Sequence, residues 1–149
     1  MIVVTSFMTI LYVDDDIDDQ NIFTESVSVI DPRIICMKAN NGIEGHELLF
    51  DDKSYLSINY IFLDINMPKM NGIELLVLIK KNEKLNNIPV YMLSTSCSEK
   101  ELAKINSLGA TMLQKQSQFK MNVGMLSSVI KSKSVVPLRT PIVRQIIPC

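Results

Sequence analysis

The sequence of 149 residues lacks several features that would assign it to particular classes of protein. Its cysteines, Cys36, Cys97 and Cys149, are odd in number and form no CxxC pair, which argues against a disulfide framework and a zinc site. No run approaches the roughly 20 apolar residues that cross a bilayer. The apolar stretch from Met1 to Val13 has no basic residue and leads straight into aspartates, unlike a cleavable signal peptide. We therefore expect a cytoplasmic protein with reduced thiols and no membrane contact.

Charge of one sign is missing toward each end of the chain. No lysine or arginine precedes Arg33, and no aspartate or glutamate follows Glu101. The formal net charge is nevertheless only −1, so bulk electrostatics favours neither nucleic acid nor an anionic membrane surface as a partner. We interpret the asymmetry as two differently charged faces of one domain.

Short apolar segments alternate with helix-length amphipathic segments along the chain. We expect strands at Met8–Val13, Arg33–Lys38, Tyr60–Leu63, Val90–Leu93 and Thr111–Gln114. These segments are close to continuously apolar, which is typical of strands that are covered on both faces. The alternation predicts an α/β fold with a doubly wound parallel sheet and right-handed crossovers. Five strands favour the flavodoxin-like strand order 2-1-3-4-5.

The helices between these strands carry recognisable boundary residues. A capping side chain stands three residues before a glutamate at Asn41, Asn71 and Ser98. Gly109 stands where the fourth helix should end. The last helix has an apolar stripe that should face the sheet, and it comprises Phe119, Val123, Leu126 and Ile130.

Acidic and hydroxyl side chains stand directly after three of the expected strands. They are Asp14, Asp15 and Asp16 after the first strand, Asp64 after the third and Ser94 after the fourth. Because the carboxyl ends of parallel strands converge on one crevice, Asp15, Asp64 and Ser94 should come within reach of one site. Buried carboxylates need a partner, and a group of carboxylate oxygens suits Mg²⁺. The sequence therefore predicts a magnesium-dependent phosphoryl-acceptor site.

Four elements occur in the order and at the spacing of a known family. They are the run Ile10–Asp16, the block Leu63–Gly72, the step Leu93-Ser94-Thr95, and Lys115. By these elements, residues 8 to 131 resemble the CheY-like receiver domain of two-component response regulators. The run Val13–Asp19 is further similar to single-domain regulators of the phytochrome-associated type.

The resemblance implies a role for each acidic residue of the predicted site. Asp64 would accept a phosphoryl group from a sensor histidine kinase or a histidine phosphotransfer protein. The receiver would assist its own phosphorylation and slowly dephosphorylate itself, without being an enzyme in the ordinary sense. Asp15, Asp64 and the backbone carbonyl of Asn66 would hold Mg²⁺, with Asp14 acting through water.

Two further side chains would contact the phosphoryl group. Lys115 would supply a compact positive charge, and Ser94 would donate a hydrogen bond to a phosphoryl oxygen. Taken alone, Lys115 is more typical of a solvated charge and Ser94 is uninformative. Asp14 and Asp15 have helix capping as their plainer interpretation, although we expect Asp16 to be the cap.

The sequence departs from the family pattern at three places. Gln116 follows Lys115 where the family usually has a proline that commonly sets a cis peptide, so this bond is either trans or strained. The spacing from Ala110 to Lys115 is one residue short, which suggests a trimmed fifth strand. Met112 occupies the place of an aromatic residue that changes rotamer on activation, which bears on the signalling output rather than on the chemistry.

We expect a receiver domain at residues 1–131 and a proline-bearing tail at 132–149. We expect the tail to be neither a second domain nor necessary for the chemistry, so that no DNA-binding domain is present and the output lies in another protein. The downstream protein target is unknown, and the apolar residues of the tail are compatible with a homodimer contact.

Two other functions compete with this interpretation. A haloacid-dehalogenase-type phosphatase also uses an aspartate nucleophile and Mg²⁺, but it needs a second aspartate where this chain has Asn66. A pure interaction module, in which phosphorylation no longer matters, is favoured only by the departures at Met112 and Gln116.

Overall fold

The computed structural model describes residues 7–51 and 54–132. Five parallel strands form one sheet in the order β2-β1-β3-β4-β5, which confirms the predicted topology. The strands are β1 (Thr9–Val13), β2 (Ile35–Ala39), β3 (Tyr60–Asp64), β4 (Val90–Ser94) and β5 (Thr111–Gln114). The helices are α1 (Ile17–Ile30), α2 (Gly42–Phe50), the short 3₁₀ turn η1 (Ser54–Ser57), α3 (Gly72–Lys81), α4 (Glu99–Ser107) and α5 (Phe119–Ser132).

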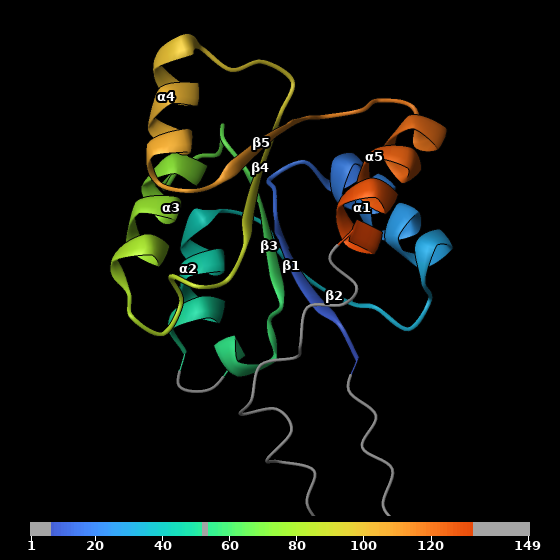
Figure 1. Ribbon diagram of the computed structural model, residues 1–149, viewed down its shortest axis with the longest axis horizontal. Helices are drawn as coiled ribbons and strands as arrows, with labels where there is room; N and C mark the ends of the chain where they lie inside the picture. Colours follow the sequence, from blue (N-terminus) through green and yellow to red (C-terminus); the bar gives the residue numbers. More distant parts are fainter. Residues whose placement is uncertain (1–6, 52–53, 133–149) are drawn as a thin grey trace, which may run out of the picture.

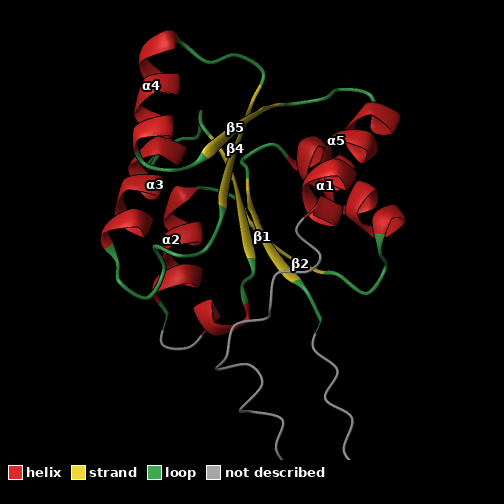
Figure 2. Cartoon of the chain, viewed as in Figure 1, coloured by secondary structure: helices red, strands yellow, loops and turns green. Residues whose placement is uncertain are grey.

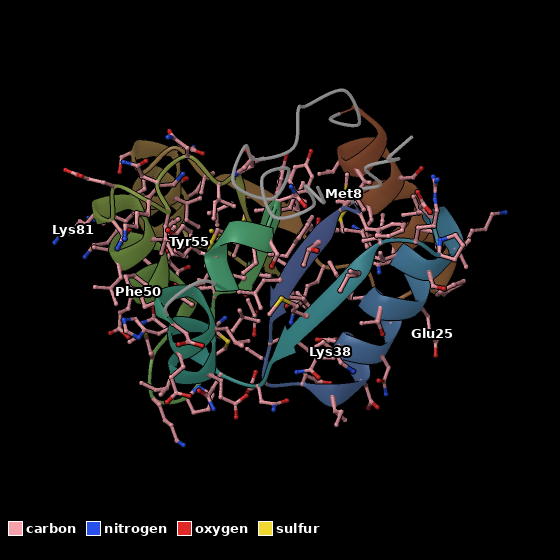
Figure 3. The ribbon with its side chains drawn as sticks, turned by 90° about the horizontal axis from the view of Figure 1, so that it is seen from below. Met8, Glu25, Lys38, Phe50, Tyr55 and Lys81 are labelled. Carbon is pink, nitrogen blue, oxygen red and sulfur yellow. The ribbon has the colours of Figure 1, made fainter. Side chains whose placement is uncertain are left out.

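The helices form layers on both faces of the sheet. Helices α1 and α5 cover one face, while α2, α3 and α4 cover the other (Figure 1). Figure 2 shows the strands between these two helical layers. From below, α1 with Glu25 and α2 with Phe50 lie on opposite sides of β1 and β2 (Figure 3). This is the doubly wound arrangement that the strand–helix alternation predicted.

Two apolar cores fill the space between these layers. The core beneath α1 and α5 is rich in aromatic rings, with Tyr12, Phe23 and Phe62 among its fully buried side chains. The core beneath α2, α3 and α4 is mainly aliphatic, with Leu11, Val13 and many leucines and isoleucines. Successive residues of β1 therefore point into different cores, as the period of a strand requires.

The expectation that all strands are covered on both faces is right for the centre of the sheet and wrong for its edges. Every residue of β1, β3 and β4 is buried. Strands β2 and β5 stand at the two edges and keep exposed positions, with Ile35 50% exposed. An edge strand has a neighbour on one side only, so apolar character alone did not reveal its exposure.

The predicted helix boundaries are confirmed. Asn41, Asn71 and Ser98 are the N-caps of α2, α3 and α4, and the last two form complete capping boxes. Asp16 caps α1 and accepts hydrogen bonds from the backbone N–H groups of Asp18 and Asp19. Gly109 follows α4 with a φ of 75°, a left-handed conformation that favours glycine.

The predicted apolar stripe of α5 is partly wrong. Leu126 and Ile130 are buried as expected, but Phe119, the first residue of the helix, is 43% exposed. The buried position nearest the start of α5 is instead Asn122, which donates a hydrogen bond of 2.9 Å to Ser26 Oγ on α1. A hydrogen-bonded pair, Asn122 and Ser26, is thus buried here instead of the Phe119 ring. Burial of these polar side chains is tolerated because each has the other as a hydrogen-bond partner.

No helix within the described ranges is both long and apolar enough to cross a membrane. Residues 133–149 of the predicted tail lie outside the described residues, so its expected role stays a prediction.

Candidate functional site

Asp64 is the last residue of β3, at the carboxyl end of the central strand, and only 5% of its surface is exposed. Burial, together with the charge of Asp14, raises the pKa of the Asp64 carboxyl to about 6, and the nearby Lys115 opposes this rise. The Asp64 carboxylate is therefore mostly ionised near neutral pH, but it sits where its charge is poorly solvated. A buried carboxylate with a perturbed pKa at the end of a strand is a candidate for a functional site.

The loop after Asp64 is packed tightly against the end of β3. A Cβ added to Gly72 would lie 2.0 Å from the Asp64 carbonyl oxygen, so only glycine fits there. The Gly72 N–H donates to the Ile65 carbonyl at 2.9 Å. Within the same loop, Lys69 has a φ of 69°, which is costly for a residue with a side chain. These contacts fix the backbone that follows Asp64.

Asp14 follows β1 and is completely buried. Its Oδ1 accepts a hydrogen bond of 2.9 Å from the Asp16 N–H. Its Oδ2 accepts a hydrogen bond of 2.5 Å from the Tyr12 hydroxyl and lies 2.8 Å from Lys115 Nζ. Gln20, also buried, donates to the Asp14 carbonyl at 2.7 Å. Both carboxylate oxygens of Asp14 therefore already have partners from the protein.

Lys115, directly after β5, connects three carboxylates. Its Nζ lies 2.8 Å from Asp14 Oδ2, 2.9 Å from Asp19 Oδ2 and 3.4 Å from Asp64 Oδ1. Burial alone would lower the pKa of Lys115, but its bonds with Asp14 and Asp19 outweigh that effect and hold the pKa above its ordinary value. The side chain is only 14% exposed, so the interpretation of Lys115 as a solvated charge is wrong.

Asp14, Asp15 and Asp64 form a group that could hold a divalent cation. Their carboxylate oxygens all lie within 4.8 Å of one another, with Asp15 exposed and the other two buried. Carboxylate oxygens are the ligands that hard divalent cations prefer, and a cation would also relieve the repulsion between Asp14 and Asp64. The donor set therefore fits the predicted metal. Asn66 lies in the exposed part of the loop, two residues after Asp64, and the role of its carbonyl stays a prediction.

Ser94 is the last residue of β4, beside β3, and is buried. Its hydroxyl donates to the Ser96 carbonyl at 2.6 Å, and its own carbonyl accepts from the Lys115 N–H at 2.9 Å. Ser94 thus lies in the predicted place, although its hydroxyl is turned to its own loop.

The three departures from the family pattern have plain structural outcomes. No cis peptide occurs within the described residues, so the bond between Lys115 and Gln116 is trans. Strand β5 has four residues where the other strands have five, in agreement with a trimmed strand. Met112 is half-buried and packs against the aliphatic core.

Two residues of the site were missed by the sequence reasoning. Asp19 lies in the first turn of α1, three residues after the cap Asp16, and its place at the start of the helix that follows the acidic run is the signal that could have found it. Tyr12 lies within an apolar run, where its hydroxyl gave no sign that it would reach Asp14.

Comparison with known proteins shows the family and agrees with this fold. The family described as response regulator receiver domain matches residues 10–126. Rcp1 of Synechocystis sp., a response regulator, is 35% identical over 98 residues, which are 62% of this chain and 65% of Rcp1. Hybrid signal transduction histidine kinase F of Dictyostelium discoideum is 34% identical over 103 residues, 69% of this chain but 8% of the kinase. The chain thus spans less than two thirds of these relatives.

Solved structures of phytochrome-associated regulators have the same fold. Phosphorylated RcpA, a cyanobacterial phytochrome response regulator, superposes with a TM-score of 0.78 at 22% identity, covering 89% of this chain and 97% of RcpA. The Mn²⁺-bound form of Rcp1 superposes with a TM-score of 0.75 at 27% identity, covering 88% of this chain and 98% of Rcp1. This chain belongs to the response regulator receiver domain family.

Proposed function

We propose that this chain is a single-domain response regulator that accepts a phosphoryl group on Asp64 in a Mg²⁺-dependent reaction. The observation that carries the proposal is the surroundings of Asp64. This buried carboxylate ends the central strand, lies close to two further carboxylates, and has the Lys115 ammonium 3.4 Å from its Oδ1. The phosphoryl donor would be a phosphohistidine of a sensor histidine kinase or a histidine phosphotransfer protein.

In the proposed step, a carboxylate oxygen of Asp64 attacks the phosphorus of the donor. A new O–P bond forms while the P–N bond breaks, and the electron pair stays on the imidazole nitrogen, which takes up a proton. The step requires the ionised form of Asp64, and a pKa of about 6 leaves most of the carboxyl groups ionised at neutral pH. The rigid packing of Gly72 against the strand end keeps this carboxylate in place.

Asp15, Asp64 and the Asn66 carbonyl would hold Mg²⁺, which when bound neutralises charge on the phosphoryl oxygens. Asp14 would act through water, because both of its oxygens already accept hydrogen bonds or an ion pair from the protein. Mg²⁺ usually keeps several waters and takes few protein ligands, so a site of this composition suits it.

Lys115 and Ser94 would contact the phosphoryl group once it is attached. Lys115 Nζ already lies beside Asp64 and could move from the carboxylates to a phosphoryl oxygen. The Ser94 hydroxyl would have to turn from the Ser96 carbonyl toward Asp64. Both movements are local, and they would bias the surrounding loops between two arrangements.

The output would be contact with a separate protein in the cytoplasm. The two-state change would be read at the protein surface, where a target binds one arrangement more tightly than the other. The proposed receiver domain occupies residues 1–131.

Binding of beryllofluoride, combined with a turnover assay, tests this function against its two competitors. We expect the wild type to bind beryllofluoride only with Mg²⁺, to show no multiple turnover of a phosphate monoester, and to lose binding in Asp64→Ala. Repeated turnover would favour a phosphatase. Failure to bind beryllofluoride with Mg²⁺ would favour an interaction module.

A further inference from the structure

We infer that Tyr12 is a positioning residue, whose hydroxyl fixes the Asp14 carboxylate and keeps it hydrogen-bonded when Lys115 moves to the phosphoryl group. The inference rests on the proposed function, because it concerns the same acidic site. It adds to that function a residue from the interior of β1 that has no part in the predicted set of site residues.

The first support is the position of the hydroxyl. The Tyr12 hydroxyl donates to Asp14 Oδ2 at 2.5 Å, and both residues are buried, with 2% and 0% of their surfaces exposed. A hydrogen bond to a charged group in such surroundings is stronger than one at the surface. Tyr12, Lys115 and Asp19 also line one small cavity of about 20 Å³ beside α1. The Tyr12 hydroxyl therefore faces the same site as the Lys115 ammonium, which bridges the carboxylates.

The second support is the packing of the ring. Tyr12 stacks on Phe23, with ring centroids 4.0 Å apart and an angle of 12° between the planes. Phe23 in turn contacts the edge of Phe62 at 5.1 Å. This packing holds the ring in one orientation, so the hydroxyl is directed at Asp14 at little entropic cost. The row of aromatic rings thus serves as a rigid base for one hydrogen bond.

The third support is the arrangement of donors around Asp14. Its Oδ2 has two, the neutral Tyr12 hydroxyl and the Lys115 ammonium, while Oδ1 has the Asp16 N–H. If Lys115 moves to a phosphoryl oxygen, the Tyr12 hydroxyl still donates to Asp14 Oδ2. Without Tyr12, the buried Oδ2 would then have no donor among the Tyr12 hydroxyl, the Lys115 ammonium and the Asp16 N–H.

Tyr12→Phe isolates the hydroxyl because it keeps the ring and its stacking. We expect this variant to bind Mg²⁺ about tenfold more weakly than the wild type, as is typical when a group that orients a metal ligand is lost. Phosphorylation by a small phosphodonor at a Mg²⁺ concentration near the wild-type dissociation constant should slow correspondingly. Saturating Mg²⁺ should restore most of the rate, which a general loss of folding would not allow.

Tyr91→Phe is the matched control. Tyr91 is also buried on this face of the sheet and stacks on Phe62, but its pKa is raised by burial alone rather than by any acidic residue. Its Mg²⁺ affinity should stay within about twofold of the wild type. An equal loss of affinity in Tyr91→Phe and Tyr12→Phe would assign the effect to packing and overturn the inference.

A double-mutant cycle adds a test that does not depend on the size of the single effect. In an Asp14→Asn background, Tyr12→Phe should change the Mg²⁺ affinity by less than about twofold, because the hydroxyl acts through Asp14. The same tenfold loss in that background would contradict the inference.

The chain has four tyrosines and no tryptophan, so near-ultraviolet absorption provides a second measurement. Mg²⁺ should perturb the tyrosine signal of the wild type and of Tyr91→Phe, and the perturbation should vanish in Tyr12→Phe.

The outcomes separate this inference from the proposed function. If the wild type neither binds Mg²⁺ nor accepts a phosphoryl group, the proposed function fails. If the wild type does both and Tyr12→Phe equals it, or if Mg²⁺ leaves the tyrosine absorption of the wild type unchanged, only the role of Tyr12 fails.

Discussion

Lys115 and Asp19 are 96 residues apart in the chain and form an ion pair of 2.9 Å. The pair ties the loop after β5 to the first turn of α1, beside the candidate acceptor Asp64. Because Lys115 also contacts Asp14 and Asp64, Asp19 competes with them for the Lys115 ammonium, which the proposed reaction needs at the phosphoryl group. With Asp19, the site has one more negative charge than the group formed by Asp14, Asp15 and Asp64.

Asp19→Asn should speed phosphorylation by a small anionic phosphodonor by about twofold or more. Removing this charge lowers the repulsion toward the donor and frees Lys115 from one partner. The measurement is the initial rate of phosphoryl incorporation with Mg²⁺ at low ionic strength. Asp18→Asn is the control, since Asp18 lies exposed on the same turn. A rate that is unchanged in Asp19→Asn, or raised equally in both variants, would refute the competition.

Lys115→Ala should destabilise the protein by about 3–5 kcal/mol. Its removal leaves Asp14 and Asp64 buried without their shared cation, which is far costlier than losing an exposed pair. A solvated lysine, which Lys115 taken alone would suggest, would contribute little to folding, but the Lys115 side chain is only 14% exposed. Urea unfolding at neutral pH measures the change, with Lys120→Ala on the exposed side of α5 as the control. A loss no greater than that of the control would argue against the buried network.

Asp64→Asn should instead raise the free energy of unfolding at pH 7, by roughly 2–3 kcal/mol. The Asp64 pKa rises from 3.8 to about 6 on folding, so the folded state binds this proton more tightly than the unfolded state. The wild type therefore loses stability as the pH rises from about 4 through 6, and the uncharged variant does not. Urea unfolding at pH 4 and pH 7 should show a gain at pH 7 that largely disappears at pH 4. An equal gain at both pH values would contradict the raised pKa.

Asp15→Asn should weaken Mg²⁺ binding and phosphorylation together while leaving the thermal midpoint nearly unchanged. Asp15 is exposed, so its charge costs little to solvate, yet its carboxylate lies within the group of oxygens that could hold a cation. Calorimetric titration with Mg²⁺ and the rate of phosphorylation provide the two measurements. Unaltered Mg²⁺ affinity in Asp15→Asn would remove this residue from the metal site.

Much of the fold and the centre of the site could be predicted because each depends on local patterns. The apolar runs end where the strands end, and Asn71 and Ser98 cap their helices as capping boxes require. Asp64 and Lys115 lie at strand ends, so the order of the strands was enough to bring them to one edge of the sheet.

The features that could not be predicted depend on which way individual side chains turn. Tyr12 looked like one more apolar residue of β1, and its bond to Asp14 follows from the depth of the ring beneath α1. Phe119 matched the helical stripe but lies exposed at the start of α5, while Asn122 takes a buried place because Ser26 faces it. Periodicity places a residue on a face and does not reveal its partner across the interface.

The central claim is that Asp64 accepts the phosphoryl group, and the intact mass of the protein tests it most directly. The wild type and Asp64→Ala are incubated with a small phosphodonor, with Mg²⁺ and with a chelator in its place. We predict that the wild type gains one phosphoryl group only with Mg²⁺ and that Asp64→Ala gains none. A stable phosphoryl group at full yield on Asp64→Ala, or on the wild type in the presence of the chelator, would contradict the account.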